Sequence, residues 1–307
     1  RSPSRGLGDV YKRQPSDRMF IWPERWDKPF VDSTFACSSY ENCHVPWGNT
    51  HEESLKLVRD NDFISGQYVW TGFDYIGEPT PYGWPARSSY FGIVDLAGFP
   101  KDVYYLYQSE WNPGKEVLHL FPHWNWTPGQ DIDMWAYYNN ADEVELFVNG
   151  KSQGIRTKGK DDFHVMWRVK YEPGVVRAVS RRNGKTVLER EIRTAGEPAQ
   201  IRLTADRSEI KSDGKDLIFI SVEILDKDGN LCPNADNQVM FDVQGAGFIA
   251  GVDNGSPISM EPFKADRRKA FYGKCLVVIQ NNSQSGGIKL TATADGLKSA
   301  VMAASSK

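Results

Sequence analysis

The side chains best suited to chemistry in this 307-residue chain gather between residues 66 and 82, in the stretch GQYVWTGFDYIGEPTPY. Residues 67–73 are rich in Tyr, Val, Trp and Thr, which is typical of a buried strand. A loop follows with two carboxylates, Asp74 and Glu78, two tyrosines and two prolines. Because α/β barrels build their sites from such loops at the carboxyl ends of strands, the pattern predicts a binding site here.

Trp70 is the residue of this stretch that indicates a ligand. Its flat apolar ring with one N–H donor suits the C–H face of a sugar. The alternative is that Trp70 belongs only to a core, and the pattern alone leaves both open.

The surrounding elements must position this stretch. An amphipathic helix capped by Thr50 is expected before it, and a loop and a second helix are expected after it. Helix, strand, loop and helix form the end of a parallel α/β unit, and one and a half such units cannot close a barrel. A long aromatic loop opens the segment and is expected to cover a site. In order, these are loop 17–47, helix 52–62, strand 67–73, loop 88–100 and helix 102–111.

The rest of the chain reads as short alternating strands separated by turns. The first group indicates an immunoglobulin-like sandwich, in which Asn149-Gly150 and Asn183-Gly184 form hairpin turns. It has no Cys–Trp–Cys framework, so it is not an antibody domain. A second sandwich follows the linker 196–198. The predicted strands are 116–121, 132–138, 143–148, 151–155, 164–171, 175–181 and 186–193, then 201–205, 217–225, 238–243, 270–280 and 287–294.

Composition excludes several classes of function. The formal net charge is -3 and the pI about 6.0, so the chain lacks the basic footprint of a protein that binds nucleic acid or anionic membranes. No apolar run is long enough for a membrane span, and no leader pattern opens the chain. The cysteines have no metal-ligand spacing; Cys37 and Cys43 are either bridged or free. The histidines, likewise without metal spacing, are interpreted as structural; they are His44, His51, His119, His123 and His164.

Four strings carry a family resemblance: GQYVWTGFDYIGEPTPY, SSYFGIVDLAGFPKD, PHWNW and NNADEVELFVNGKSQG. They resemble the C-terminal part of glycoside hydrolase family 2, in its bacterial β-galactosidase-like branch common in gut Bacteroidetes. The resemblance covers nearly everything after residue 15, and residues 197–307 are similar to the bacterial immunoglobulin-like repeats that end many such enzymes. The basic residues 1–14 resemble an adapter-derived sequence and are set aside as non-native.

The resemblance implies a fold and a chemistry. Members are retaining exo-glycosidases with a TIM-barrel catalytic domain, in which an acid/base glutamate follows strand four in an Asn-Glu pair and a nucleophilic glutamate follows strand seven. The two carboxyls must lie about 5–5.5 Å apart. No Asn-Glu pair occurs in the sequence, and the nucleophile would precede residue 15, so both catalytic glutamates are expected to be absent and the chain to be an inactive fragment.

Residue by residue, the resemblance places Trp70 at the floor of the subsite for the terminal sugar. Asp74 and Glu78 would accept hydrogen bonds from sugar hydroxyls. The alternatives are a helix cap or structural ion pair for Asp74 and a solvated loop charge for Glu78. Four further tryptophans would line the leaving-group side or merely anchor their loops, namely Trp22, Trp26, Trp47 and Trp84. PHWNW is expected to pack the first sandwich on the barrel.

The sequence therefore predicts a multidomain chain: residues 1–14 non-native, 15–114 the remnant of a (β/α)8 TIM barrel, 115–195 an immunoglobulin-like β-sandwich and 196–307 a bacterial immunoglobulin-like β-sandwich. The parent enzyme would hydrolyse terminal β-galactosides of oligo- or polysaccharides, without cofactor or metal, and be periplasmic or secreted. A β-glucuronidase of the same family and a non-catalytic carbohydrate-binding or adhesive sandwich protein are the alternatives. Arg87 is the nearest cation to the loop, and this scarcity favours a neutral galactoside.

Overall fold

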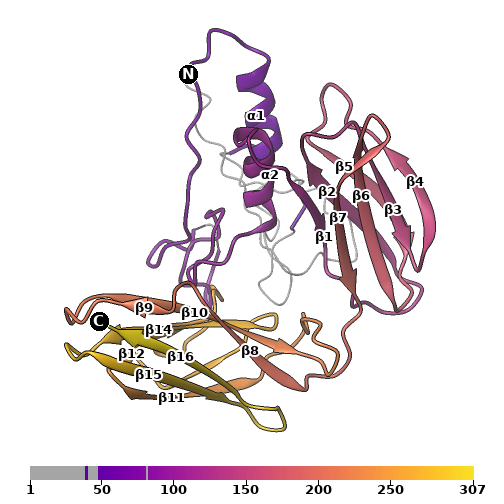
Figure 1. Cartoon of the computed structure of the whole chain (residues 1–307). Coiled ribbons are helices and arrows are strands. Elements are labelled where there is room, and N and C mark those ends of the chain that lie inside the picture. The colour runs from indigo at the N-terminus through magenta and orange to yellow at the C-terminus, as the bar shows by residue number, and fades with distance from the viewer. Residues whose placement is uncertain (1–38, 41–47, 81) are drawn as a thin grey trace. The chain divides into compact units, whose positions relative to one another are not determined.

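The computed structural model describes residues 39, 40, 48–80 and 82–307 (Figure 1). Several predictions concern residues outside this part of the chain: the non-native residues 1–14, the state of Cys37 and Cys43, and the roles of His44, Trp22, Trp26 and Trp47. The chain divides into two compact units, with the boundary between Thr194 and Ala195.

The first unit contains a sandwich of two antiparallel sheets (Figure 1). One sheet has the order β1-β2-β5 and the other the order β4-β3-β6-β7. The Asn-Gly pairs that close two of its hairpins have positive φ at both positions, 48° and 79° at Asn149 and Gly150, as a type I′ turn requires. The predicted β-sandwich is confirmed. Its strands are β1 (Leu118–Phe121), β2 (Asp131–Tyr138), β3 (Glu143–Val148), β4 (Lys151–Arg156), β5 (His164–Lys170), β6 (Val175–Arg182) and β7 (Lys185–Arg193).

Strand β2 is buried on both faces, unlike its counterpart in the other sheet. In β3, buried and half-buried residues alternate, as expected for a strand with one face toward the core. In β2 every residue after Asp131 is buried. Ile132, Met134, Ala136 and Tyr138 belong to the core between the sheets, whereas the alternate residues Trp135 and Tyr137 belong to a separate apolar cluster on the outer face.

Two helices form that second cluster with the sheet. α1 (His51–Arg59) begins with a capping box, in which Thr50 Oγ1 accepts from the Glu53 backbone and the Glu53 carboxylate accepts from the Thr50 backbone. α2 spans Asp102–Trp111, the predicted bounds. The apolar side chains Leu55 from α1 and Val103, Leu106 and Tyr107 from α2 share the cluster with Phe121, Trp135 and Tyr137 from the sheet.

Each helix also places one carboxylate from its first turn on a histidine of the sheet. Glu52 lies 2.7 Å from Nδ1 of His164, whose ring stacks on Trp135. Asp102 lies 2.8 Å from Nε2 of His119, whose ring stacks on Tyr105. These histidines have structural partners, and so does His51, whose Nδ1 is 2.7 Å from the Tyr107 hydroxyl.

The structure corrects the role expected for PHWNW. Trp124 is fully buried in the core between the two sheets, and its Nε1 donates to the Glu172 carbonyl. His123 stacks on Trp126 within the same loop. Packing of the sandwich against the helices instead comes from Phe121, Trp135 and Tyr137, because these side chains are on the outer face of the sheet.

The strand predicted at 67–73 is also wrong. Regular strand structure is absent there; the backbone is extended, and residues 71–74 pair in parallel with 91–94 through isolated bonds. Tyr68, Trp70 and Phe73 are 87%, 55% and 63% exposed, as expected for a strand of a barrel remnant that has lost its neighbours. Composition correctly indicated extended backbone, but a buried strand needs partners on both edges and cover on both faces.

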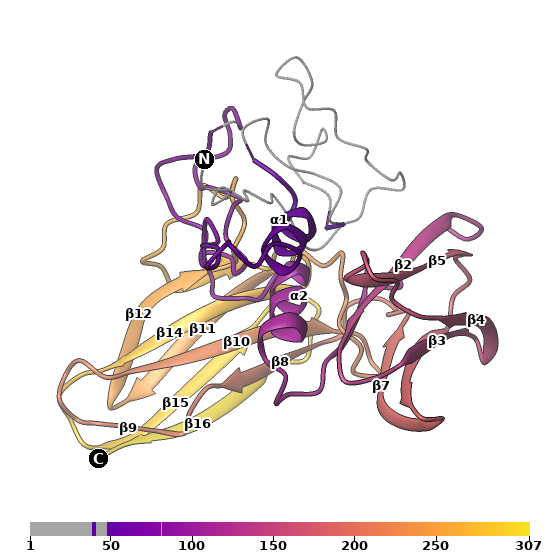
Figure 2. The same cartoon turned by 90° about the horizontal axis from the view of Figure 1, so that it is seen from above.

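The second unit is a sandwich of two larger sheets (Figure 2). The sheets have the orders β12-β14-β10-β8 and β13-β11-β15-β16-β9, with β9 parallel to β16. Sequence reasoning missed β9, β12, β13 and β16, which are short or rich in Gly, Ala and Ser. The strands are β8 (Gln200–Ala205), β9 (Glu209–Ile210), β10 (Leu217–Leu225), β11 (Gln238–Gly245), β12 (Gly247–Asp253), β13 (Arg267–Lys269), β14 (Lys274–Asn281), β15 (Gly286–Thr293) and β16 (Ala300–Ser306).

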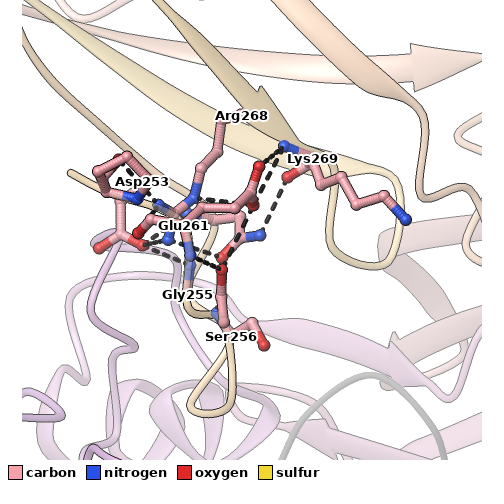
Figure 3. A network of polar contacts seen from close by, with 9 residues as sticks. Asp253, Gly255, Ser256, Glu261, Arg268 and Lys269 are labelled. Carbon is pink, nitrogen blue, oxygen red and sulfur yellow. Dashed lines mark hydrogen bonds and ion pairs between the residues drawn. The ribbon is translucent and has the colours of Figure 1, made fainter. Parts of the chain in front are cut away.

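A buried arginine organises the long connection between β12 and β13. Arg268 has no exposed surface, and its guanidinium donates to the Glu261 carbonyl and to Asp253 Oδ1 (Figure 3). It also lies over the ring of Phe263. Asp253 in turn accepts from the backbone of Asn254. The guanidinium thus ties the end of β12 to the returning loop through charge-assisted bonds.

Replacing this arginine should destabilise the second unit. Arg268→Met removes the cation that lies 3.2 Å from Asp253 Oδ1 and 3.6 Å from Glu261 Oε2. Breaking such a buried pair costs about 3 kcal/mol or more. The neighbouring exposed residue is the control, since Arg267→Met should change the free energy of unfolding by less than about 0.5 kcal/mol. Urea unfolding of both variants measures the difference. Equal free energies of unfolding would show that the bonds of Arg268 do not stabilise the second unit.

His123 should make the first unit sensitive to acid. Burial lowers its pKa from 6.5 to about 4. Between these two pH values the unfolded chain binds a proton at His123 and the folded chain does not. The free energy of unfolding therefore falls as the pH drops from about 6.5 toward 4. His123→Gln removes the titrating group, so its loss of stability over this range should be smaller by about 2 to 3 kcal/mol. Urea midpoints that fall equally in both proteins as the pH is lowered to 4 would show that His123 is not the group responsible.

Candidate functional site

Trp70 and Glu78 are brought together by a third residue, Tyr75. The indole Nε1 of Trp70 donates to the Tyr75 hydroxyl at 3.2 Å, and that hydroxyl donates to Glu78 Oε2 at 3.2 Å. The two rings meet edge to face, with centroids 6.4 Å apart. Trp70 and Glu78 are exposed and Tyr75 is half-buried. The arrangement holds an open aromatic face next to a carboxylate, which is suitable for a neutral ligand with both apolar and hydroxyl surfaces.

The phenol of Tyr75 is held in its protonated form. Burial is the main cause that raises its pKa, the Glu78 carboxylate raises it further, and the bond from the Trp70 N–H opposes both. A protonated phenol can accept from the indole and donate to the carboxylate at once. Tyr75 therefore fixes Trp70 and Glu78 relative to each other. Sequence reasoning noted two tyrosines in this loop, but nothing in the pattern distinguished Tyr75 from Tyr82, which is buried against Tyr90.

Asp74 is buried and forms an ion pair, and the sugar contact predicted for it stays a prediction. Its Oδ2 lies 2.7 Å from the ammonium of Lys101, and its Oδ1 accepts from the Gly92 backbone at 2.7 Å. The side chains of both partners are almost wholly inaccessible to solvent. This is the alternative left open by the sequence, a structural ion pair. Lys101, the cation of this pair, is distant from Asp74 in the sequence and lies in no recognisable motif.

The segments on either side of this ion pair run closely in parallel. Asp74 N donates to Val94 O at 2.9 Å, and Val94 N donates to Gly72 O at 3.0 Å. At Gly92 the approach is so close that a Cβ would lie 2.1 Å from Asp74 N. A glycine is therefore required by space here. Trp70 directly precedes this paired segment, and Tyr75 and Glu78 follow it.

Several exposed apolar side chains lie near Trp70 and Glu78 in the sequence. Phe63, Phe73, Ile76 and Trp84 are all more than half exposed. Trp84, which the sequence placed near a leaving group, makes no ring contact with Trp70 among the residues described. Many large apolar side chains of this stretch are therefore accessible for contact with other groups.

Metal and thiol chemistry find no support in the part of the chain that the structure describes. Within it, no three or more His, Cys, Asp or Glu side chains gather as metal ligands. Cys232 and Cys275 are free and buried, and burial raises the pKa of Cys232 to about 11, so the thiol is a poor nucleophile. Among these same residues, no helix has the length and hydropathy of a membrane span.

Two family models match the chain. Residues 201–303 match the glycoside hydrolase family 2 C-terminal domain 5, and residues 129–188 match a domain of unknown function, DUF4982. The first match covers most of the second unit and the second lies in the first sandwich. Neither includes the residues around Trp70.

Curated relatives extend the likeness across almost the whole chain. The chain is 77% identical over 292 residues to "Beta-galactosidase BoGH2A" of Bacteroides ovatus, covering 95% of this chain and 34% of that protein. It is 36% identical to a "Putative beta-glucuronidase" of Formosa agariphila, covering 77% of this chain and 23% of that protein. The chain thus spans about a third or less of the length of these relatives.

A solved structure shows the same architecture. A β-glycosidase from Bacteroides vulgatus is similar with a TM-score of 0.84 and 31% identity, covering 98% of this chain and 40% of that one. A glycosyl hydrolase family 2 member from Bacteroides cellulosilyticus is similar with a TM-score of 0.76 and 31% identity, covering 83% of this chain and 38% of that one.

A methyl group at Gly92 should separate the paired segments. Gly92→Ala places Cβ against the Asp74 backbone, and overpacking of this kind costs about 3 kcal/mol. Gly72→Ala is the matched control on the opposite segment, because no atom lies within 4 Å of its Cβ position. Hydrogen exchange at the Asp74 and Val94 amides should accelerate in the first variant only. Unchanged protection in Gly92→Ala would mean that the segments are not held together as described.

Proposed function

Because the chain belongs to glycoside hydrolase family 2 and matches the C-terminal part of its members, we propose that it forms that part of a retaining exo-β-glycosidase acting on terminal β-galactosides. The observation that carries the proposal is the exposed Trp70 ring held beside Glu78 by Tyr75. This arrangement offers a stacking surface for the C–H face of a terminal sugar and an acceptor for its hydroxyls.

The paired segment supports a barrel origin for residues 15–114. A parallel pairing of 71–74 with 91–94, followed by helix α2, is what the end of a parallel α/β unit contains. A pure sandwich protein has no need of such a unit. We therefore favour the enzyme over a non-catalytic carbohydrate-binding or adhesive protein.

The bond-breaking residues are assigned to other parts of the enzyme. Retaining hydrolysis needs an acid/base and a nucleophilic carboxyl about 5–5.5 Å apart. In the described part of this segment, Glu52 bonds to His164, Glu53 caps α1 and Glu110 pairs with Lys158. Glu78 is bonded to Tyr75 and exposed. The role left for this chain is to receive and orient the terminal sugar.

The charge of the site favours a neutral sugar. A glucuronide carboxylate needs a cation, and Arg87 is the one Lys or Arg between residues 60 and 100. Lys101 is close but is committed to Asp74 and to the Tyr90 carbonyl. The second candidate is a β-glucuronidase, because several relatives from Formosa agariphila and one from Bacteroides fragilis carry that name.

Activity measurements test the proposal. The 307-residue chain alone should not hydrolyse nitrophenyl β-galactoside above background. In the complete enzyme, Trp70→Ala should lower kcat/KM by about 30- to 160-fold, because the lost aromatic contact is worth about 2 to 3 kcal/mol. Trp111→Ala, an exposed tryptophan at the end of α2, is the control and should change kcat/KM little.

Two outcomes would contradict this account. Faster turnover of nitrophenyl β-glucuronide than of the galactoside would support the second candidate. Turnover by the isolated chain that Glu78→Gln abolishes would place the chemistry in the loop itself.

A further inference from the structure

We propose that Lys101 is a positioning residue for the sugar-facing ring of Trp70, acting through Asp74 and Tyr75; this rests on the function proposed above. Lys101 precedes α2 at its N-cap, yet it makes no side-chain cap bond to the helix. Its side chain is fully buried, and its ammonium lies 2.7 Å from Asp74 Oδ2 and donates to Tyr90 O at 2.8 Å.

The ammonium joins three separate parts of the chain. Asp74 ends the segment that begins at Trp70, Tyr90 precedes the segment that pairs with it, and Lys101 starts the helix packed on the sandwich. Asp74 completes the connection by accepting from Gly92 N with its other oxygen. A lysine has three donors on a long stem, so it can satisfy a carboxylate and a carbonyl that belong to different segments.

The connection reaches Trp70 through the residue after Asp74. Tyr75 N donates to Ser89 Oγ at 3.1 Å, and Ser89 N donates to Tyr75 O at 2.8 Å. With its backbone fixed on both sides, Tyr75 presents its hydroxyl to the Trp70 indole and to Glu78. Lys101 touches none of the surface open to a ligand, so its influence on the site must pass through these bonds.

Loss of Lys101 should act on Trp70 because Asp74 cannot remain as it is. A buried carboxylate without its cation must take up water, accept a proton or move outward. Each change alters the backbone at Asp74 and Tyr75. The core between the sheets, which contains Trp124 and Trp167, has no part in the ion pair. Trp70 should therefore respond while these two tryptophans do not.

Fluorine NMR of the purified 307-residue chain, labelled with 5-fluorotryptophan, separates these sites. Trp70→Phe identifies the Trp70 line, and equivalent substitutions identify Trp124 and Trp167. In Lys101→Met the Trp70 line should shift or broaden while the two core lines keep their positions. Lys115→Met, an exposed lysine beyond α2, is the control and should leave all three lines unchanged.

A double variant tests whether the ion pair is the cause. Asp74→Asn in the Lys101→Met background removes the uncompensated carboxylate and retains an acceptor for Gly92 N. The Trp70 line should return toward its original position. If Lys101→Met alone fails to fold, this double variant is compared directly with the parent chain. A Trp70 line unchanged in Lys101→Met, or still displaced in the double variant, would overturn the proposal.

A titration with methyl β-galactoside separates this proposal from the function on which it rests. Addition of the sugar should move the Trp70 line of the parent chain, and the midpoint concentration should rise at least tenfold in Lys101→Met. A parent chain that does not respond to the sugar would argue against the proposed function. The positioning role would still be decided by the sugar-free spectra.

Discussion

The burial of β2 on both faces is the constraint on which the first unit depends. One set of its side chains fills the core between two sheets, and the other set contacts two helices. The loop that carries the site leaves from the end of α1 and returns at the start of α2. Because both helices are packed on the same sheet, the sandwich fixes the two ends of the loop.

Apolar packing alone would not hold the loop between those ends. The stretch from Phe63 to Trp84 has many exposed large side chains and few regular backbone bonds. Its order comes from the close parallel approach at Gly92 and from the buried pair of Asp74 and Lys101. In this stretch a buried ion pair therefore contributes to order that apolar packing provides in the sandwich.

Local patterns were sufficient to predict most of the fold. Alternation located all seven strands of the first sandwich within a few residues, and the Asn-Gly turns were recognisable because their backbone requires positive φ. Strand β16, with the sequence AVMAASS, escaped because small residues carry little signal of burial. The strand expected at 67–73 lacks regular strand structure, because a strand needs hydrogen-bonded neighbours that composition does not report. Trp70 and Glu78 could be selected by type, but Tyr75 and Lys101 matter through contacts that only the folded chain creates.

A crystal structure of the complete enzyme with bound galactose tests the central claim most directly. The account predicts the terminal sugar with its C–H face on the Trp70 ring, a hydroxyl bonded to Glu78, and the Asp74–Lys101 pair beneath the site without contact to the sugar. Galactose bound away from Trp70, or Asp74 released from Lys101 to bind a hydroxyl, would contradict it.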